Sequence, residues 1–177
     1  MKSIIKTLLI GFILMGCSSV HPLYNELDDA PKWVRTSYIE GYITGIGIAR
    51  SNKGDDIDLQ RTEATELGRN KLSGTIETKA EGFFSKFAQS IGVKDKEKFM
   101  RDVKNQVKTV TKQKVKGARV KDSWISKRGN FYVLMILETK SVVNIIKHDI
   151  KLKDNDKEFQ RFLSEEGDKE LEKSLEN

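Results

Sequence analysis

The sequence predicts an α+β fold in which a layer of helices packs against a three-stranded antiparallel sheet. Three observations predict it. Apolar side chains recur at helical spacing over residues 57–91. Residues 42–50 alternate between two faces like a strand, and residues 115–126 and 131–137 flank an Arg128-Gly129-Asn130 turn like a hairpin. A chain of 177 residues is long enough for one domain with a tether and a tail.

The first strand is expected to have one face of small residues. Ile43, Gly45, Gly47 and Ala49 share this face, and small side chains let a helix approach closely. Two closely spaced glycines also begin a dinucleotide-binding loop, but Arg50 stands where the third glycine would be, so nucleotide binding is not indicated.

A long helix is expected over residues 57–91, with Asp55 and Asp56 supplying N-cap oxygens. A bend or break near Gly74 or Gly82 is an open alternative. The inward residues recur every four positions, which drifts relative to the helical period of 3.6 residues. These inward residues are Ala64, Gly68, Leu72, Ile76, Ala80 and Phe84, with Leu67, Phe83 and Phe87 extending the face as it rotates.

A second amphipathic helix follows Gly92, with its apolar face formed by Met100, Val103, Val107 and Val110. In the hairpin, residues 131–137 have no polar face, which favours a central strand and the order first, third, second. We expect Trp124 in the core, on the sheet face that meets the long helix. The opposite sheet face would then be uncovered and available for a partner or for self-association.

The C-terminal part is expected to form a short apolar helix over residues 142–150 and an acidic helix over residues 159–175. Residues 154–177 carry 9 Asp or Glu against 4 Lys or Arg. The acidic helix could dock through its apolar side chains or remain mobile, and the sequence does not choose between these alternatives.

The N-terminus has the pattern of a lipoprotein signal. Lys2 and Lys6 precede a short apolar run that ends in Leu14-Met15-Gly16-Cys17, which is similar to a lipobox. We expect residues 1–16 to be removed, the Cys17 thiol to be acylated, for example with palmitate, and residues 17–30 to act as a tether. The folded domain would then span residues 31–153 and the tail residues 154–177. The alternatives are an uncleaved signal anchor and an ordinary secretory peptide with a chance cysteine.

Basic residues are concentrated between Lys94 and Arg128, with 13 Lys or Arg against 4 Asp or Glu. Lys104, Lys108 and Lys112 follow one another at spacings of four on the second helix, so they share one face. An exported chain rarely meets nucleic acid, so the expected anionic partner is a glycan such as peptidoglycan, or a lipid. The alternative is that these lysines are only solvated.

Motifs for catalysis and metal binding are missing from the sequence. His21 and His148 are isolated from other ligand-type residues at metal-binding spacing, and Cys17 is the only cysteine. Asp55-Asp56 fits a helix cap, and Glu165-Glu166 fits an exposed tail. We therefore expect no enzyme activity, no metal and no cofactor.

Several motifs together resemble one known family. They are Pro31-Lys32-Trp33, the Gly45-Ile46-Gly47-Ile48-Ala49 strand, the helix with four-residue spacing, and Val115 to Trp124 followed by Phe131-Tyr132-Val133-Leu134. Over residues 31–152 the chain resembles the Lpp-twenty family of outer-membrane lipoproteins, which is related to the N-terminal domain of flagellar assembly protein T. The chain differs from the family pattern at Gly68, where Ala is common, and in its acidic C-terminal extension.

The resemblance implies an α+β domain that is held at the outer membrane by its lipid and has no agreed biochemical activity. Lipoproteins with Asp after the acylated cysteine are retained at the inner membrane in enteric bacteria, and this chain has Ser18 there. The first functional hypothesis is a non-enzymatic interaction module in envelope or flagellar assembly. The alternatives are a binding module for an anionic glycan or lipid, and an enzyme of unrecognised type.

Overall fold

The computed structural model describes residues 26–52, 54, 56–152 and 155–176 and confirms the α+β prediction. The sheet has the order β1-β3-β2 with antiparallel pairing, as expected. Its strands are β1 (Tyr42–Ala49), β2 (Arg119–Ile125) and β3 (Phe131–Glu138). The helices are α2 (Lys32–Arg35), α3 (Ile57–Ser90), α4 (Lys96–Lys114), α5 (Thr139–Asp149), α6 (Asp156–Phe162) and α7 (Asp168–Glu176). A 3-10 turn, η1 (Val115–Gly117), precedes β2, and a π-helical turn, η3 (Leu163–Gly167), joins α6 to α7.

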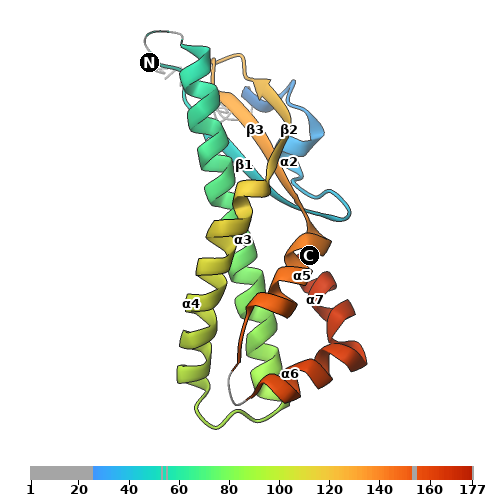
Figure 1. The fold of residues 1–177 in the computed structure, drawn as a ribbon. Helices are drawn as coiled ribbons and strands as arrows, with labels where there is room; N and C mark the ends of the chain where they lie inside the picture. Colours follow the sequence, from blue (N-terminus) through green and yellow to red (C-terminus); the bar gives the residue numbers. More distant parts are fainter. Residues whose placement is uncertain (1–25, 53, 55, 153–154, 177) are drawn as a thin grey trace, which may run out of the picture.

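The long helix α3 organises the molecule (Figure 1). Its N-cap is Asp56, whose carboxylate accepts a hydrogen bond from the Leu59 N–H at 3.0 Å. The helix runs through Gly74 and Gly82 without a break, over about 50 Å at 1.5 Å per residue. Its first half lies on the sheet, and its second half extends beyond the sheet to pack against the other helices.

Glycines let α3 approach the sheet closely. A Cβ atom on Gly47 would lie 1.8 Å from the Ala64 carbonyl oxygen, and one on Gly45 would lie 2.4 Å from the Gly68 oxygen. A Cβ atom on Gly68 itself would lie 2.8 Å from the Met135 side chain. The small-residue face of β1 therefore meets the helix, as predicted. The predicted inward residues of α3 are buried, except that Leu67 is 43% exposed.

The two faces of β3 are both buried. Phe131, Val133, Met135 and Leu137 face the helices, whereas Tyr132, Leu134 and Ile136 face the other way. Because Trp124 pairs with Tyr132, it lies on the face away from α3, and the prediction that it faces the long helix is wrong. The reason is a β-bulge between Val120 and Asp122, since an extra residue moves all following side chains to the opposite face.

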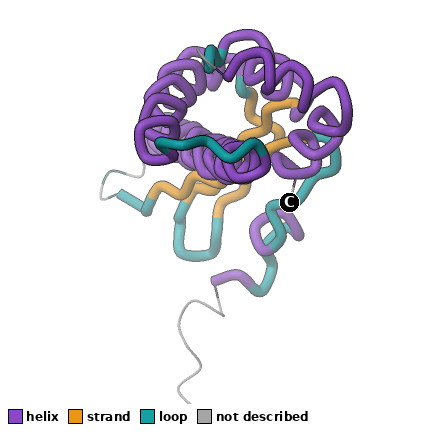
Figure 2. The backbone as a smooth tube through the Cα atoms, turned by 90° about the horizontal axis from the view of Figure 1, so that it is seen from below, coloured by secondary structure: helices purple, strands orange, loops and turns teal. Residues whose placement is uncertain are grey.

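The sheet face away from α3 is covered by residues 26–39, so the expected uncovered face is also a wrong prediction. Figure 2 shows the strands between the helical layer and the short N-terminal segment that holds α2. The Trp33 indole N–H donates to Asp122 at 2.7 Å, and the Thr44 hydroxyl donates to the Ser37 carbonyl. Residues 26–30, which we expected in the tether, belong to this packed segment, because Glu26 is only 4% exposed. The rest of the expected tether lies outside the described residues.

The acidic C-terminal segment is docked, which resolves the alternative left open by the sequence. It forms α6, η3 and α7 rather than one straight helix, and after the π-helical turn η3 the helix α7 packs against α3 and α5. The Phe159 ring lies 5.4 Å from Phe84 and 5.3 Å from Phe87, between ring centroids. Leu171 and Leu175 are fully buried, so this segment completes the core of the helical half.

Candidate functional site

The predicted lysine row lies on an exposed face of α4. Lys104, Lys108 and Lys112 all point away from the core, which α4 contacts through Val103, Val107 and Thr111. The Lys104 Nζ atom lies 3.4 Å from Glu81 Oε1 of α3, so part of its charge is compensated. An exposed pair of this kind contributes little stability, but it reduces the positive potential of the row. Cys17, the predicted lipidation site, lies outside the described residues.

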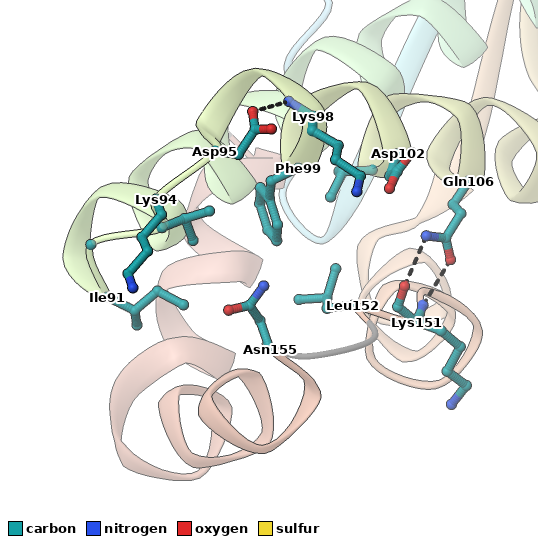
Figure 3. Close-up of a pocket in the computed structure, with 13 residues that line it drawn as sticks. Ile91, Lys94, Asp95, Lys98, Phe99, Asp102, Gln106, Lys151, Leu152 and Asn155 are labelled. Carbon is teal, nitrogen blue, oxygen red and sulfur yellow. Dashed lines mark hydrogen bonds between the residues drawn. The ribbon is translucent and has the colours of Figure 1, made fainter.

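A hollow of about 480 Å³ lies where α4 passes the connection between α5 and α6 (Figure 3). Phe99, Leu152 and Asn155 point toward one another across it. The apolar wall is formed by Ile91, Val93, Phe99, Val103 and Leu152, and the polar lining by Lys94, Asp95, Lys98, Asp102, Gln106, Lys151 and Asn155.

One wall of the hollow is held by a paired hydrogen bond. The Gln106 side-chain N–H donates to the Lys151 carbonyl at 2.8 Å, and its oxygen accepts from the Lys151 N–H at 2.8 Å. At the start of the same helix, Asp95 caps α4 by accepting a hydrogen bond from the Lys98 N–H at 3.0 Å. This hollow combines an apolar wall with charges of both signs. Sequence reasoning missed it because Gln106 and Lys151 are brought together only by the tertiary fold.

A second groove, of about 350 Å³, runs beside the edge strand β1. Tyr38 and Tyr42 line one side, and Lys71, Thr75 and Lys79 of α3 line the other. The Lys79 ammonium group also donates to the Leu175 carbonyl at 2.7 Å, which ties α7 to α3. Tyr38 is 63% exposed at this groove, so an aromatic surface is available there.

Glu26 is a buried carboxylate that sequence reasoning also missed. It accepts hydrogen bonds from the Ser126 hydroxyl at 2.8 Å, the Asn130 amide at 2.6 Å and the Tyr132 hydroxyl at 3.1 Å. Burial alone would raise the pKa of Glu26, but these hydrogen bonds and nearby Arg128 outweigh it and lower the pKa. Burial and the bond to Glu26 raise the pKa of Tyr132 to about 12. The hydrogen bonds of Glu26 to Ser126, Asn130 and Tyr132 link the N-terminal segment to the sheet.

Within the described ranges, His, Cys, Asp and Glu side chains form no group of three or more that could hold a metal ion. His148 is exposed near the end of α5. None of the helices in the same described part of the chain is long and apolar enough to cross a membrane.

A family model described as LPP20 lipoprotein matches residues 31–138, which is more than half of the chain. The chain therefore belongs to the LPP20 lipoprotein family, and so is a membrane-anchored envelope protein. The matched residues run from α2 through β3, whereas α5, α6 and α7 follow the match. None of the curated proteins is similar enough to the chain to count as a match.

Proposed function

We propose that this lipoprotein is anchored at the outer membrane through acylated Cys17 and acts there as a non-enzymatic interaction module. Envelope assembly, including flagellar assembly, is the process in which we place it. The observation that carries the proposal is the match to a lipoprotein family, which agrees with the lipobox pattern at Leu14-Met15-Gly16-Cys17. Ser18, in place of the Asp that retains lipoproteins at the inner membrane, supports the outer membrane as the destination.

The surface supports a protein partner. The hollow beside α4 and the groove beside β1 each join apolar or aromatic side chains to lysines, and such mixed surfaces suit a peptide segment with acidic and apolar residues. Aromatic residues such as Tyr38 and Tyr42 at the β1 groove are frequent anchors in protein recognition.

Two variants test the anchor and its destination. Cys17→Ala should abolish labelling by an alkyne fatty acid and move the protein out of the membrane fraction. Ser18→Asp is the matched control, since it should keep the label but shift the protein to the inner-membrane fraction. Equal labelling of Cys17→Ala and wild type would contradict the lipid anchor, and an unchanged distribution of Ser18→Asp would contradict this sorting signal.

Photo-crosslinking in intact cells tests the interaction role. A photoreactive amino acid at Lys98 reports on the hollow, one at Tyr38 reports on the groove, and one at Lys116, on exposed η1, is the control. A discrete protein adduct from Lys98 or Tyr38, and none from Lys116, is the expected result. The absence of an adduct at both test positions would count against a protein partner at these surfaces.

The second candidate is a binding module for an anionic glycan or lipid, favoured by the exposure of Lys108 and Lys112. Attraction between exposed charges is screened over about 8 Å at physiological ionic strength, so such binding should weaken with salt. Cosedimentation of the lipid-free chain, residues 18–177, with peptidoglycan or anionic vesicles measures it. Replacing Lys104, Lys108 and Lys112 by Gln should reduce pelleting without unfolding the chain. If wild type does not pellet even at low salt, these lysines are only solvated.

A further inference from the structure

One end of the molecule is formed by three chain segments that meet near the N-terminal segment. They are residues 48–52, 56–61 and 125–130, and we refer to this end as the tip. The Gln60 side-chain amide joins them by donating to the Arg50 carbonyl at 2.9 Å and the Gly129 carbonyl at 3.0 Å. The Ser51 N–H also donates to the Asn130 side chain at 3.0 Å. In Figure 1 the tip lies at the top, opposite the turn between α3 and α4.

Exposed apolar side chains are concentrated at the tip. Most of the large apolar residues that are strongly exposed in the described part of the chain belong to its three segments: Ile48 (45%), Ile57 (46%), Leu59 (58%) and Ile125 (45%). Ile57 and Leu59 lie in the first turn of α3, beyond the region that packs closely on β1. Apolar side chains clustered at one end of a protein mark a surface that contacts something apolar.

The covalent chain limits what this surface can contact. Glu26 is fixed at the tip through Ser126 and Asn130, and only eight residues separate it from Cys17. Even a fully extended chain of this length spans about 30 Å at most. The far end of α3 lies about 50 Å from its start, at 1.5 Å per residue. The tip is therefore the end of the molecule that the tether holds near the bilayer.

The charges of the tip are nearly balanced by those of the N-terminal segment beside it. Arg61 forms an ion pair with Asp58 at 3.1 Å, Lys127 pairs with Asp29 of the N-terminal segment, and Arg128 lies near Glu26. Arg50 and Asp56 add one charge of each sign. The tip therefore carries no strong excess of one sign from these groups, so its contact with lipid would depend on apolar burial rather than on anionic headgroups. This separates it from the lysine row of α4, whose binding should depend on salt.

We propose that the tip is a second membrane contact, in which Ile57 and Leu59 enter the interfacial region of the bilayer that holds the acyl chains of Cys17. This inference rests on the proposed lipid anchor. Tethering raises the local concentration of the bilayer at the tip, so a few apolar side chains suffice. The contact directs α3 away from the membrane and presents the hollow beside α4 at the distal end.

Fluorescence quenching in proteoliposomes tests this contact with the full lipidated chain. Cys17 is the only cysteine, and its thiol would be acylated, so one introduced cysteine can be labelled selectively. Arg50→Cys places a fluorophore at the tip, and Lys96→Cys places it at the distal end of the molecule. The quencher is a nitroxide on the headgroup of phosphatidylcholine. We expect stronger quenching at position 50 than at position 96, unchanged by added phosphatidylglycerol or salt.

Replacing both apolar residues, Ile57→Ser with Leu59→Ser, should reduce the quenching at position 50 to what the tether alone produces. Tyr38→Ser, an exposed aromatic residue at the other end of β1, is the matched control and should leave it unchanged. Circular dichroism checks that each variant is folded. A chain that floats with vesicles but shows equal quenching at positions 50 and 96 would overturn the tip contact and leave the anchor intact. A chain that does not float would overturn both.

Discussion

At the residue scale, Glu26 shows how one buried carboxylate joins the N-terminal segment to the sheet. Its three hydrogen-bond donors come from the turn after β2 and from β3, about 100 residues later in the chain. Because its three donors favour the ionised carboxylate, Glu26 stabilises the fold more when it is ionised than when it is protonated.

Stability should therefore fall in acid. Because the folded state lowers the pKa of Glu26 below 4.5, its contribution is fully present above that value and is lost as the pH falls through the lower, folded value. Urea denaturation at pH 7 and below pH 4.5 measures the loss. Glu26→Gln should cost about 1–3 kcal/mol at pH 7 and flatten this pH dependence. Glu40→Gln, at an exposed position, is the control, and an equal effect of both variants would contradict the role of Glu26.

Trp124 is half-buried and stacks on Tyr132, with ring centroids 5.1 Å apart. Trp124→Ala should therefore cost less than the roughly 3–5 kcal/mol typical of a fully buried aromatic residue. Phe84→Ala, at a fully buried ring, is the comparison and should show the larger loss in thermal melts. If Trp124→Ala lowered stability as much as Phe84→Ala, the placement of Trp124 would be wrong.

At the scale of elements, the contact between α3 and β1 depends on the absence of side chains at glycine positions. Gly47→Ala would place a methyl group 1.8 Å from the Ala64 carbonyl oxygen, which only a backbone movement can relieve. We expect a loss of about 3 kcal/mol or more.

Gly74→Ala is the matched control on α3. Nothing lies within 4 Å of its Cβ position, and alanine favours a helix over glycine by about 0.5–1 kcal/mol. This variant should be slightly more stable than wild type. Denaturant titration of both variants checks the pair, and a tolerated Gly47→Ala would mean that α3 lies farther from the sheet.

At the scale of the whole molecule, the core extends beyond the residues that match the family. The ring of Phe83 lies 6.5 Å from Phe159, and the ring of Phe87 lies 5.3 Å from Phe162, between ring centroids. The helices after residue 138 therefore cover the part of α3 that the sheet does not reach.

Truncation after Leu152 should expose these phenylalanines. Removing α6 and α7 uncovers three rings on α3, so we expect a lower melting temperature and strong binding of a hydrophobic dye. Truncation after Leu175 is the control, because it removes only two residues and retains α7 up to Leu175. If the longer truncation melted like wild type without binding dye, the C-terminal helices would not be part of the core.

Much of the fold could be predicted because its signals are local. The spacing of Ala64, Gly68, Leu72 and their successors predicts α3, and the apolar run of residues 131–137 predicts a central strand. The candidate surfaces could be predicted less well. The lysine row follows from helical spacing, but Glu26, Gln106 and Lys151 have no local signal, because their partners are far away in the sequence.

The sequence by itself determined the three strands, their order in the sheet, the long helix and the lipoprotein character of the chain. The helix and the strands follow from the local spacing of apolar residues, and the lipoprotein character follows from the lipobox motif and the family resemblance. Only the tertiary structure decided the face of Trp124, the covering of the sheet by residues 26–39, and the docking of the acidic tail. The physical reason is that one bulge inverts the side-chain alternation of a strand, and docking depends on which apolar surfaces remain exposed once the other elements have packed.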